Sequence, residues 1–299
     1  MKILRAAHLG MCFGVRDAIT LARQEAAAGP VTVLGDLVHN ETVLSQLRHQ
    51  GVRFEPRLDT VQTPTVVITA HGASERRLAE VRDRGHRLIE ATCPLVRFAH
   101  ERLAALVRQG FHPVIVGQRN HVEVRGMTED LAAFDVVLDD ADVASVASHQ
   151  KFGVVAQTTQ PLSRVRHLLA LLQTRFPDSQ IQFADTVCLP TKRRQQAAED
   201  IAAQSDVVVV VGGAHSNNTR ELVATCRRFG ARAHHVQTAG DLQPEWFQPG
   251  DSVGITAGTS TPDETIDAVE ARLLEWAGTH SQPALAPSPR EIVPVSLRS

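Results

Sequence analysis

The stretch HRLIEATCPLVRFAHERLAALVRQG (residues 86–110) shows how this chain is built. It begins with a short apolar run, passes through Cys93, and continues with apolar residues three and four positions apart. That spacing is typical of a helix with one buried face, and Gly110 stands where such a helix is expected to end. The stretch therefore predicts a strand, a cysteine at the junction, and a helix.

Two further cysteines, Cys12 and Cys188, lie at junctions of the same kind. The fourth, Cys226, lies inside a helical stretch (219–230) and is predicted to be a core residue. The segments flanking the two junctions are ILRAAH (3–8) and FGVRDAITLARQ (13–24) for Cys12, and IQFADTV (181–187) and LPTKRRQQAAEDIAAQ (189–204) for Cys188.

Six β-branched runs alternate with helical stretches along the rest of the chain, which is the pattern of parallel α/β folds. Two of these runs precede each strand–cysteine junction, if the N-terminal junction at Cys12 is grouped with the last two runs near the C-terminus. We therefore predict three pseudo-symmetric α/β subdomains whose strand ends face one centre. The runs are VTVLGD (31–36), TVVITA (65–70), HPVIVG (112–117), FGVVAQ (152–157), DVVVVVG (206–212) and SVGITAG (252–258).

The C-terminal residues 277–299 are rich in Pro and Ser, which predicts an extended surface tail with EIVPVSL (291–297) as a late edge strand. The three subdomains are expected over residues 1–92 (with His39 and His71, and with Cys12 at the centre), 93–187 and 188–276.

Composition narrows the class of protein. The chain has 299 residues, 43% of them hydrophobic, and a formal net charge of −2, so a nucleic-acid partner has little support. We see no signal peptide at the N-terminus and no apolar run long enough to span a membrane, so the expected location is the cytoplasm. Four scattered cysteines do not form a disulfide framework.

Cysteines at strand–helix junctions suit metal binding, because a helix N-terminus is expected to lower the pKa of a thiol and thiolates are the metal-binding form. Structural zinc sites usually take cysteines in close pairs, whereas Cys12, Cys93 and Cys188 are far apart in the sequence. Three thiolates fit one 4Fe–4S cluster per chain with its fourth iron open as a Lewis acid. A zinc hydrolase remains the alternative from these residues.

Polar residues at the other strand ends indicate an anion site. Imidazole, hydroxyl and amide groups are hydrogen-bond donors, and two of the serines precede probable helices, where backbone N–H groups favour phosphate. The segment GGAHSNNTREL (212–222) lacks the GK[ST] of a nucleotide-binding loop, which argues against triphosphate hydrolysis. The candidate anion ligands are His39, His71, His121, Ser216, Asn217, Asn218 and Ser260.

Glu123, two residues after His121, is the only carboxylate in these strand-end clusters. Beside an open iron it would act as a general acid, with Thr158 as a relay.

With these residues in hand, the chain resembles the 4-hydroxy-3-methylbut-2-enyl diphosphate reductase (LytB) family nearly from end to end. The order and spacing of the motifs make the resemblance specific. They are CFGV at Cys12, VHN at His39, AHG at His71, ATCPLV at Cys93, HVEVRGM at His121, QTT at Thr158, VC at Cys188, SNNT at Ser216 and AGTSTPD at Ser260.

The resemblance implies a trefoil of three α/β domains around a 4Fe–4S cluster held by Cys12, Cys93 and Cys188. It also implies the last step of the methylerythritol phosphate route to isoprenoids. The substrate hydroxyl would bind the open iron, Glu123 and Thr158 would supply protons, and a ferredoxin or flavodoxin would supply two electrons. The implied substrate-binding residues are His39, His71, His121, Thr158, Ser216, Asn217, Asn218 and Ser260.

The chain departs from the usual pattern after the third cysteine, with Pro190, Lys192 and Arg193, and at His215 and Asn217. Three alternatives therefore stay open beside the reductase and the zinc hydrolase. They are a paralogous reductive dehydroxylase with another phosphorylated substrate, a non-catalytic iron–sulfur sensor, and a non-catalytic anion-binding protein.

Overall fold

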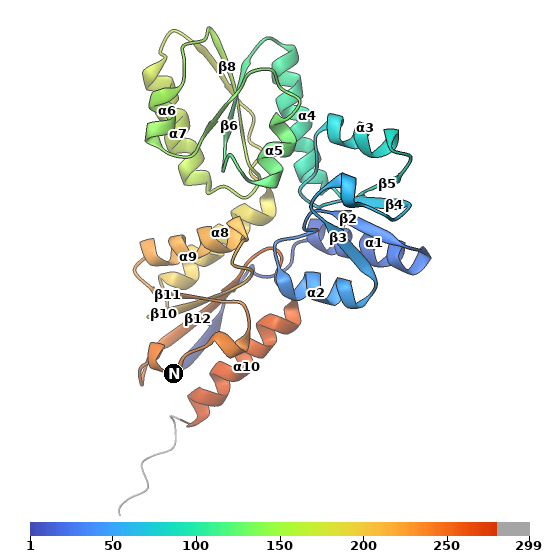
Figure 1. Cartoon of the computed structure of the whole chain (residues 1–299). Helices are drawn as coiled ribbons and strands as arrows, with labels where there is room; N and C mark the ends of the chain where they lie inside the picture. Colours follow the sequence, from blue (N-terminus) through green and yellow to red (C-terminus); the bar gives the residue numbers. More distant parts are fainter. Residues whose placement is uncertain (280–299) are drawn as a thin grey trace, which may run out of the picture.

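The computed structural model describes residues 1–279 as three lobes that meet at one centre (Figure 1). Each lobe holds a four-stranded parallel sheet, in the order β3-β2-β4-β5, β7-β6-β8-β9 or β11-β10-β12-β1. The same arrangement of edge and central strands thus recurs three times. The predicted fold of three pseudo-symmetric α/β subdomains is confirmed.

The elements of the first sheet and of the helices around it are β2 (Val31–Leu34), β3 (Val52–Glu55), β4 (Thr65–Ile68), β5 (Arg87–Glu90), α1 (Phe13–Ala28), α2 (Glu41–His49) and α3 (Glu75–Asp83). Those of the second are β6 (His112–Val116), β7 (Asp135–Val137), β8 (Lys151–Ala156), β9 (Gln180–Phe183), α4 (Pro94–Arg108), α5 (Val122–Thr128), α6 (Asp140–Ser145) and α7 (Leu162–Arg175). Those of the third are β10 (Val207–Val211), β11 (Arg232–Val236), β12 (Ser252–Ala257), β1 (Lys2–Arg5), α8 (Leu189–Ala202), α9 (Asn217–Arg228) and α10 (Asp263–Thr279).

The central strands are covered on both faces, as parallel sheets require. All five valines of β10 are buried, and helices α8 and α9 on one side and α10 on the other pack against this sheet. The six runs predicted as strands and the three strands before the cysteines are all present. The edge strands β3, β7 and β11 were missed, because their sequences are short or interrupted by polar residues.

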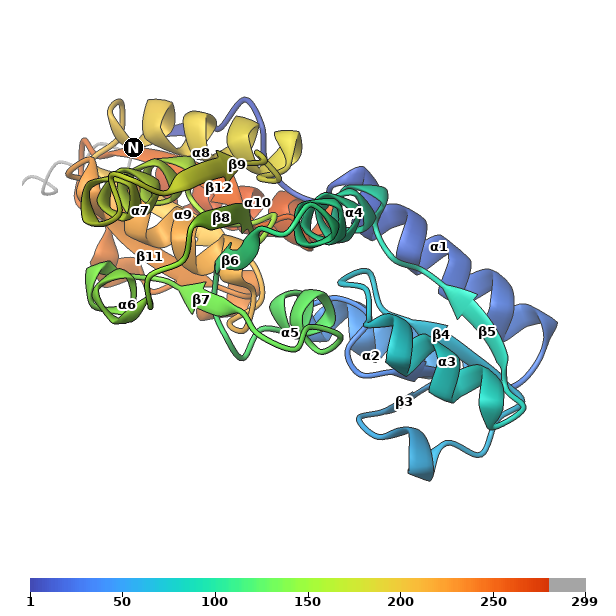
Figure 2. The ribbon, with the colours of Figure 1, turned by 90° about the horizontal axis from the view of Figure 1, so that it is seen from above.

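Each of the three junction cysteines lies where the chain passes from one sheet to the next. Strand β5 of the first sheet leads through Cys93 into α4, which packs on β6 and β8 of the second. In the same way Cys188 leads from β9 into α8 on the third sheet, and Cys12 leads from β1 into α1 on the first. Figure 2 shows α1, α4 and α8 along one side of the molecule, with the lobes around them.

The N-terminal strand closes the third sheet. Lys2–Arg5 pair with Ser252–Ile255 of β12 in parallel register, although the two strands are at opposite ends of the chain. The subdomain boundaries expected at residues 92, 187 and 276 stay predictions. The expected edge strand EIVPVSL lies outside the described residues. Within residues 1–279 no helix has the length and apolar character needed to cross a bilayer.

Candidate active site

The three junction cysteines meet at the centre of the trefoil. Cys12, Cys93 and Cys188 are the N-cap residues of α1, α4 and α8, and none of the three side chains caps its own helix. All three are free thiols with partly exposed side chains. The thiol of Cys12 is close enough to interact electrostatically with both others. Cys226, in contrast, is fully buried in α9 and lies in the core as predicted.

The spacing of the thiols bears on the group that they can hold. One Zn²⁺ bound at about 2.3 Å to three thiolates requires sulfur atoms within about 4.6 Å of one another. Among the described residues, the three thiols do not all lie within 4.8 Å of one another. As they stand, the three thiols are too far apart to bind a single ion together, whereas a larger group such as an iron–sulfur cluster would take ligands that lie farther apart.

A glycine and an arginine shape the surroundings of these thiols. A Cβ on Gly14 would lie 2.4 Å from Sγ of Cys93, so only glycine fits beside this sulfur. Arg194, nearly buried in α8, donates from Nε (3.0 Å) and from a terminal nitrogen (2.5 Å) to the carbonyl of Gly10. This guanidinium ties the loop of Cys12 to the helix of Cys188 and places a positive charge beside both thiols.

The expected effect of the helix N-termini on the thiols is outweighed by burial. Burial raises the pKa of Cys93, although its sulfur also faces the backbone N–H groups of Leu95 and Val96. Burial likewise raises the pKa of Cys188 to about 11, against the opposing effect of its contact with Thr191. The expectation of lowered thiol pKa values is therefore wrong for these two cysteines in the free protein. A bound cation is what would favour their thiolates.

Glu123 lies buried between the thiols and the second sheet. It is 1% exposed, it interacts electrostatically with Cys93 and Cys188, and it accepts two hydrogen bonds from Thr158. Burial raises the pKa of Glu123 to about 7, against the lowering effect of both Thr158 bonds. The carboxyl group is therefore able to give or take a proton near neutral pH.

Three histidines from two lobes form one cluster. The ring centroids of His39 and His71 lie 4.3 Å apart, and His121 lies 5.2 Å from the first and 5.6 Å from the second. Burial lowers the pKa of all three, that of His121 to about 3, so the rings are neutral before an anion enters. Nδ1 of His121 accepts the backbone N–H of Glu123, which leaves Nε2 to carry the proton.

The turn at the start of α9 supplies further donors. Ser216 caps the helix by accepting from the N–H of Thr219. Nδ2 of Asn218 is buried and has no partner within residues 1–279, whereas its Oδ1 accepts from the N–H of Thr259. Nδ2 of Asn217 already donates to Thr159. Of the two asparagines, Asn218 thus has the free donor.

The lobes approach closely at this turn. A Cβ on Gly213 would lie 2.2 Å from the carbonyl oxygen of His39, so glycine allows the end of β10 to touch the first lobe. Ser260 donates to the same carbonyl oxygen at 3.2 Å. A hollow of about 40 Å³ lies between the lobes here, lined by Val15, Val38, His39, His71, His121, Glu123, Thr159, Ser216, Asn217, Asn218, Thr259 and Ser260.

The structure thus brings the candidate residues together around Glu123, which lies near Cys93 and Cys188 and also lines the hollow of the candidate anion ligands. Sequence reasoning missed Gly14, Arg194 and Thr259. The glycine of CFGV was a visible signal, because it follows Cys12 by two residues. Thr259 directly precedes Ser260, but its contact with Asn218 joins distant segments, as does the contact of Arg194 with Gly10.

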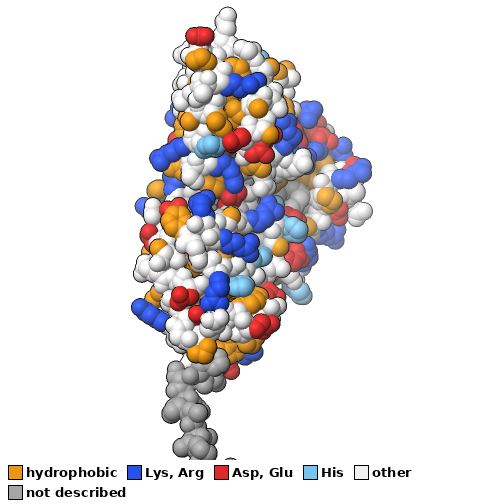
Figure 3. Space-filling view, turned by 90° about the vertical axis from the view of Figure 1, so that its left-hand side faces the viewer, with side chains coloured by type: hydrophobic (Ala, Val, Ile, Leu, Met, Phe, Trp, Pro, Cys, Tyr) orange, Lys and Arg blue, Asp and Glu red, His pale blue; other side chains and the backbone are white. Residues whose placement is uncertain are grey.

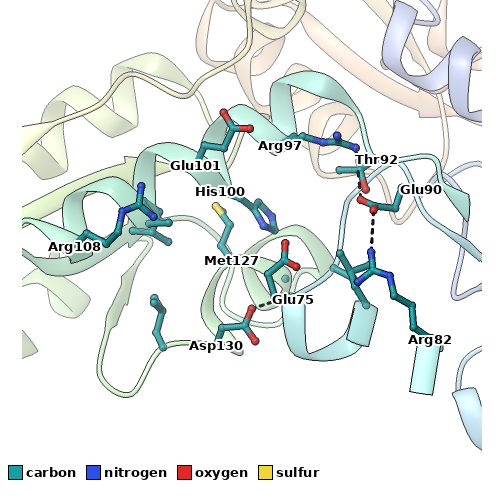
Figure 4. A pocket seen from close by; sticks show the side chains of 16 residues that line it. Glu75, Arg82, Glu90, Thr92, Arg97, His100, Glu101, Arg108, Met127 and Asp130 are labelled. Atoms are coloured by element: carbon teal, nitrogen blue, oxygen red, sulfur yellow. Dashed lines mark hydrogen bonds and ion pairs between the residues drawn. The ribbon is translucent and has the colours of Figure 1, made fainter. Parts of the chain in front are cut away.

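A separate hollow of about 610 Å³ lies between the first and second lobes, against α3, α4 and α5 (Figure 4). Acidic and basic side chains alternate around it, with Arg82 paired to Glu90 and the N–H of Glu75 bonded to Asp130. It contains none of the candidate site residues. Its mixed charge gives it no preference for a diphosphate.

The family follows from a direct comparison. The family model described as "LytB protein" matches residues 3–274. The chain belongs to the LytB family.

Curated LytB relatives cover nearly the whole chain. The protein of Aquifex aeolicus is 34% identical over 281 residues, which are 92% of this chain and 96% of the relative. That of Geobacter sp. (strain M21) is 36% identical over 278 residues, covering 91% and 98%. Both are named 4-hydroxy-3-methylbut-2-enyl diphosphate reductase.

Solved LytB-type structures have the same architecture. One, titled as (E)-4-hydroxy-3-methyl-but-2-enyl diphosphate reductase, the terminal enzyme of the non-mevalonate pathway, is 33% identical with a TM-score of 0.66 and covers 92% of this chain and 100% of its own. The E-1-hydroxy-2-methyl-but-2-enyl-4-diphosphate reductase from Plasmodium falciparum is 24% identical with a TM-score of 0.85, covering 98% and 95%, and supports the fold.

Proposed function

We propose that the chain is the reductase that removes the hydroxyl group of 4-hydroxy-3-methylbut-2-enyl diphosphate, giving isopentenyl diphosphate and dimethylallyl diphosphate. The names of its LytB relatives support this activity. The observation that carries it is the position of Glu123, a buried acid with a pKa of about 7 between three thiols and a cluster of neutral hydrogen-bond donors. A non-catalytic sensor has no use for such an acid.

The residues of the hollow would bind the diphosphate. His39, His71 and Asn218 present donors in a buried setting, where each hydrogen bond to an anion is strong. A bound diphosphate would raise the pKa of the imidazoles, so that they hold it as cations as well as donors. The hollow is lined by residues of all three lobes, so a substrate that enters it would contact each lobe.

Cys12, Cys93 and Cys188 would hold the iron–sulfur cluster, and the wide spacing of the thiols and the absence of a Cβ at Gly14 both fit such a group. A bound 4Fe–4S cluster with one open iron would supply the electrons and a Lewis acid for the substrate hydroxyl. Arg194 would offset part of the negative charge of the thiolates.

Glu123 would supply the proton for the leaving oxygen. The allylic C–O bond breaks with its electron pair on oxygen, the oxygen takes a proton and leaves as water, and two electrons and a second proton complete the allyl product. Thr158 orients the carboxyl group with both of its hydrogen bonds and connects it to the backbone at the end of β8. The buried site keeps bulk water away from the reacting carbon.

The electron donor would be a small acidic carrier of the ferredoxin or flavodoxin class. Phe13 and Leu189 directly follow Cys12 and Cys188, and these apolar side chains are 48% and 54% exposed. Arg193 is also exposed and lies near the start of α8, four residues after Leu189. Figure 3 shows several Lys and Arg side chains near the middle of one face of the molecule. An acidic partner would therefore find apolar and basic groups beside the thiols.

We place the enzyme in the cytoplasm.

The test is turnover of the purified, cluster-loaded protein with a dithionite-reduced mediator and the proposed diphosphate substrate. Formation of both isopentenyl and dimethylallyl diphosphate is expected. Asn218→Ala should weaken substrate binding by about tenfold to a hundredfold, since it removes the free buried donor. Asn217→Ala should weaken it less, since that amide is already bonded to Thr159.

Reduction of another phosphorylated allylic alcohol in preference to this one would favour the paralogous dehydroxylase. A loaded protein that binds the diphosphate and turns over no alcohol would leave only the sensor or the anion-binding protein. Stoichiometric zinc in place of iron and sulfide after anaerobic purification would favour the zinc hydrolase.

A further inference from the structure

The amino ends of the second sheet carry a second cluster of metal-ligand residues, far from the cysteines. His112 is the first residue of β6, Asp135 is the first residue of β7, and His149 lies two residues before β8. Their ligand atoms all lie within 4.8 Å of one another, and no other such group exists among residues 1–279. The cluster faces away from Glu123, because Glu123 and Thr158 follow the opposite ends of β6 and β8. The length of β6 alone separates the two by about 13 Å.

The distance between two of the ligand atoms is close to that for a shared ion. Nε2 of His112 lies 2.9 Å from Oδ2 of Asp135. Two ligands at about 2.0–2.1 Å from one tetrahedral ion are separated by roughly 3.3–3.4 Å, so the two atoms would move apart by about 0.4–0.5 Å to share it. A metal ion would therefore take the place of the proton that the two side chains now share, with little movement of either.

His149 is placed to supply the third ligand. Its ring stacks on that of His112, with centroids 3.7 Å apart and planes 5° from parallel. Within the described part of the chain, neither of its ring nitrogens makes a hydrogen bond. A rotation of this partly exposed ring would bring one nitrogen to the ion.

The surroundings favour a fixed site. The backbone carbonyl of His149 accepts from Ser179 at 2.7 Å, which holds its loop against the turn before β9. Phe152, fully buried, lies edge-on beneath both imidazoles with centroids 5.6 Å and 6.1 Å away. One side of the cluster is thus a dry aromatic wall and the other is open to solvent, from which an ion and its remaining water ligands would come.

We propose that His112, Asp135 and His149 bind one divalent transition-metal ion of the Zn²⁺ class, separately from the iron–sulfur site. Two imidazoles and one carboxylate suit zinc, whereas Mg²⁺ and Ca²⁺ prefer oxygen ligands alone. The ion fastens the starts of three neighbouring segments of the second sheet. It has no path to the reacting substrate, so its role is structural.

The experiment is equilibrium dialysis of the cluster-loaded protein against Zn²⁺, with zinc, iron and sulfide measured in the same samples. One zinc per chain is expected beyond the unchanged iron, together with a higher melting temperature of the protein. His149→Gln and Asp135→Asn should each lower the zinc affinity at least about tenfold without changing iron content or turnover. The matched control is His167→Gln, since His167 pairs with Asp140 at 2.7 Å in the same lobe but has no third ligand.

Equal zinc binding by the wild type, His149→Gln and Asp135→Asn would overturn the proposal, as would no bound zinc at about 0.1 mM free ion. Zinc that displaces iron from the cysteines would appear as a loss of iron and sulfide. If zinc binds only at the cysteines, the proposal is also contradicted. Because turnover is measured separately, a failure here leaves the proposed reductase activity standing.

Discussion

Thr158 donates two hydrogen bonds to the carboxylate of Glu123, one from its backbone N–H to Oε1 (2.7 Å) and one from its hydroxyl to Oε2 (3.1 Å). The two residues come from different elements of the second lobe, the start of α5 and the end of β8. Both hydrogen bonds favour the ionised carboxylate, whereas burial favours the neutral acid. The pKa of about 7 is the balance between these effects.

Replacing Glu123 by Gln should abolish most turnover and leave substrate binding nearly unchanged. The amide can still accept the Thr158 N–H, so the site should keep its shape, but it cannot protonate the leaving oxygen. We expect kcat to fall by about 10²–10⁴-fold. The measurement is turnover with a reduced mediator, beside the spectral change of the cluster on substrate addition. The control is Glu129→Gln, at the C-cap of the same helix. Near wild-type turnover of Glu123→Gln would remove this residue from the mechanism.

The pH dependence of turnover should report the pKa of Glu123. In the proposed mechanism the acid form donates the proton, and it predominates below about pH 7, so kcat should fall as the pH rises through that value. Thr158→Val removes the hydroxyl that lowers this pKa, so the falling limb should move to higher pH. A limb that stays in place in the valine variant would assign it to another group.

Serine in place of Cys12, Cys93 or Cys188 should remove or cripple the iron–sulfur cluster. A hydroxyl is a poor ligand for iron, and the three thiols share one site. Cys226→Ser should retain the cluster, since Cys226 lies in the core of the third lobe. The measurement is iron and sulfide content with the visible spectrum after anaerobic purification. Equal loss in all four variants would show that the cysteines have been assigned wrongly.

Gly14→Ala should impair cluster binding without unfolding the chain. The new Cβ would lie 2.4 Å from Sγ of Cys93, so this thiol must move out of its present position in the cysteine site. Gly29→Ala is the matched control, because Gly29 ends the same helix and has no atom within 4 Å of the added Cβ. Iron content and circular dichroism separate the two effects. Full iron content in Gly14→Ala would contradict the close packing around Cys93.

Reversing the charge of Arg193 should affect the protein electron donor alone. Arg193→Glu is expected to raise KM for a reduced ferredoxin or flavodoxin at least about tenfold and to weaken its salt dependence, because it repels an acidic surface. Turnover with dithionite and a small dye should not change. An equal effect on both donors would place Arg193 in the catalytic site and reject the docking face.

The sequence predicted the repeated strand–cysteine–helix plan well because it depends on local signals. Apolar runs, helix ends and the residues that follow strands are all visible in one stretch such as 86–110. The short edge strands were missed, because pairing with a neighbour defines them more than their composition does. The contact of Arg194 with Gly10 and the approach of Gly213 to His39 join distant segments, and no local pattern reports them. The thiol pKa values also depend on burial, which only the folded structure shows.

The pairing of β1 with β12 has a consequence for how the protein is made. The backbone N–H groups of Gly10 and Cys12 donate to the carbonyls of Ala257 and Thr259, so the first cysteine takes its position only when the last strand is present. About 250 residues separate the paired strands, and at roughly 5–20 residues per second the ribosome needs about 12–50 s to add them. During this time Cys93 and Cys188 leave the ribosome while Cys12, made before them, is not yet held in its final position. The proposed cluster would therefore be inserted only after β12 has been made, and a chain truncated before β12 should be released without iron.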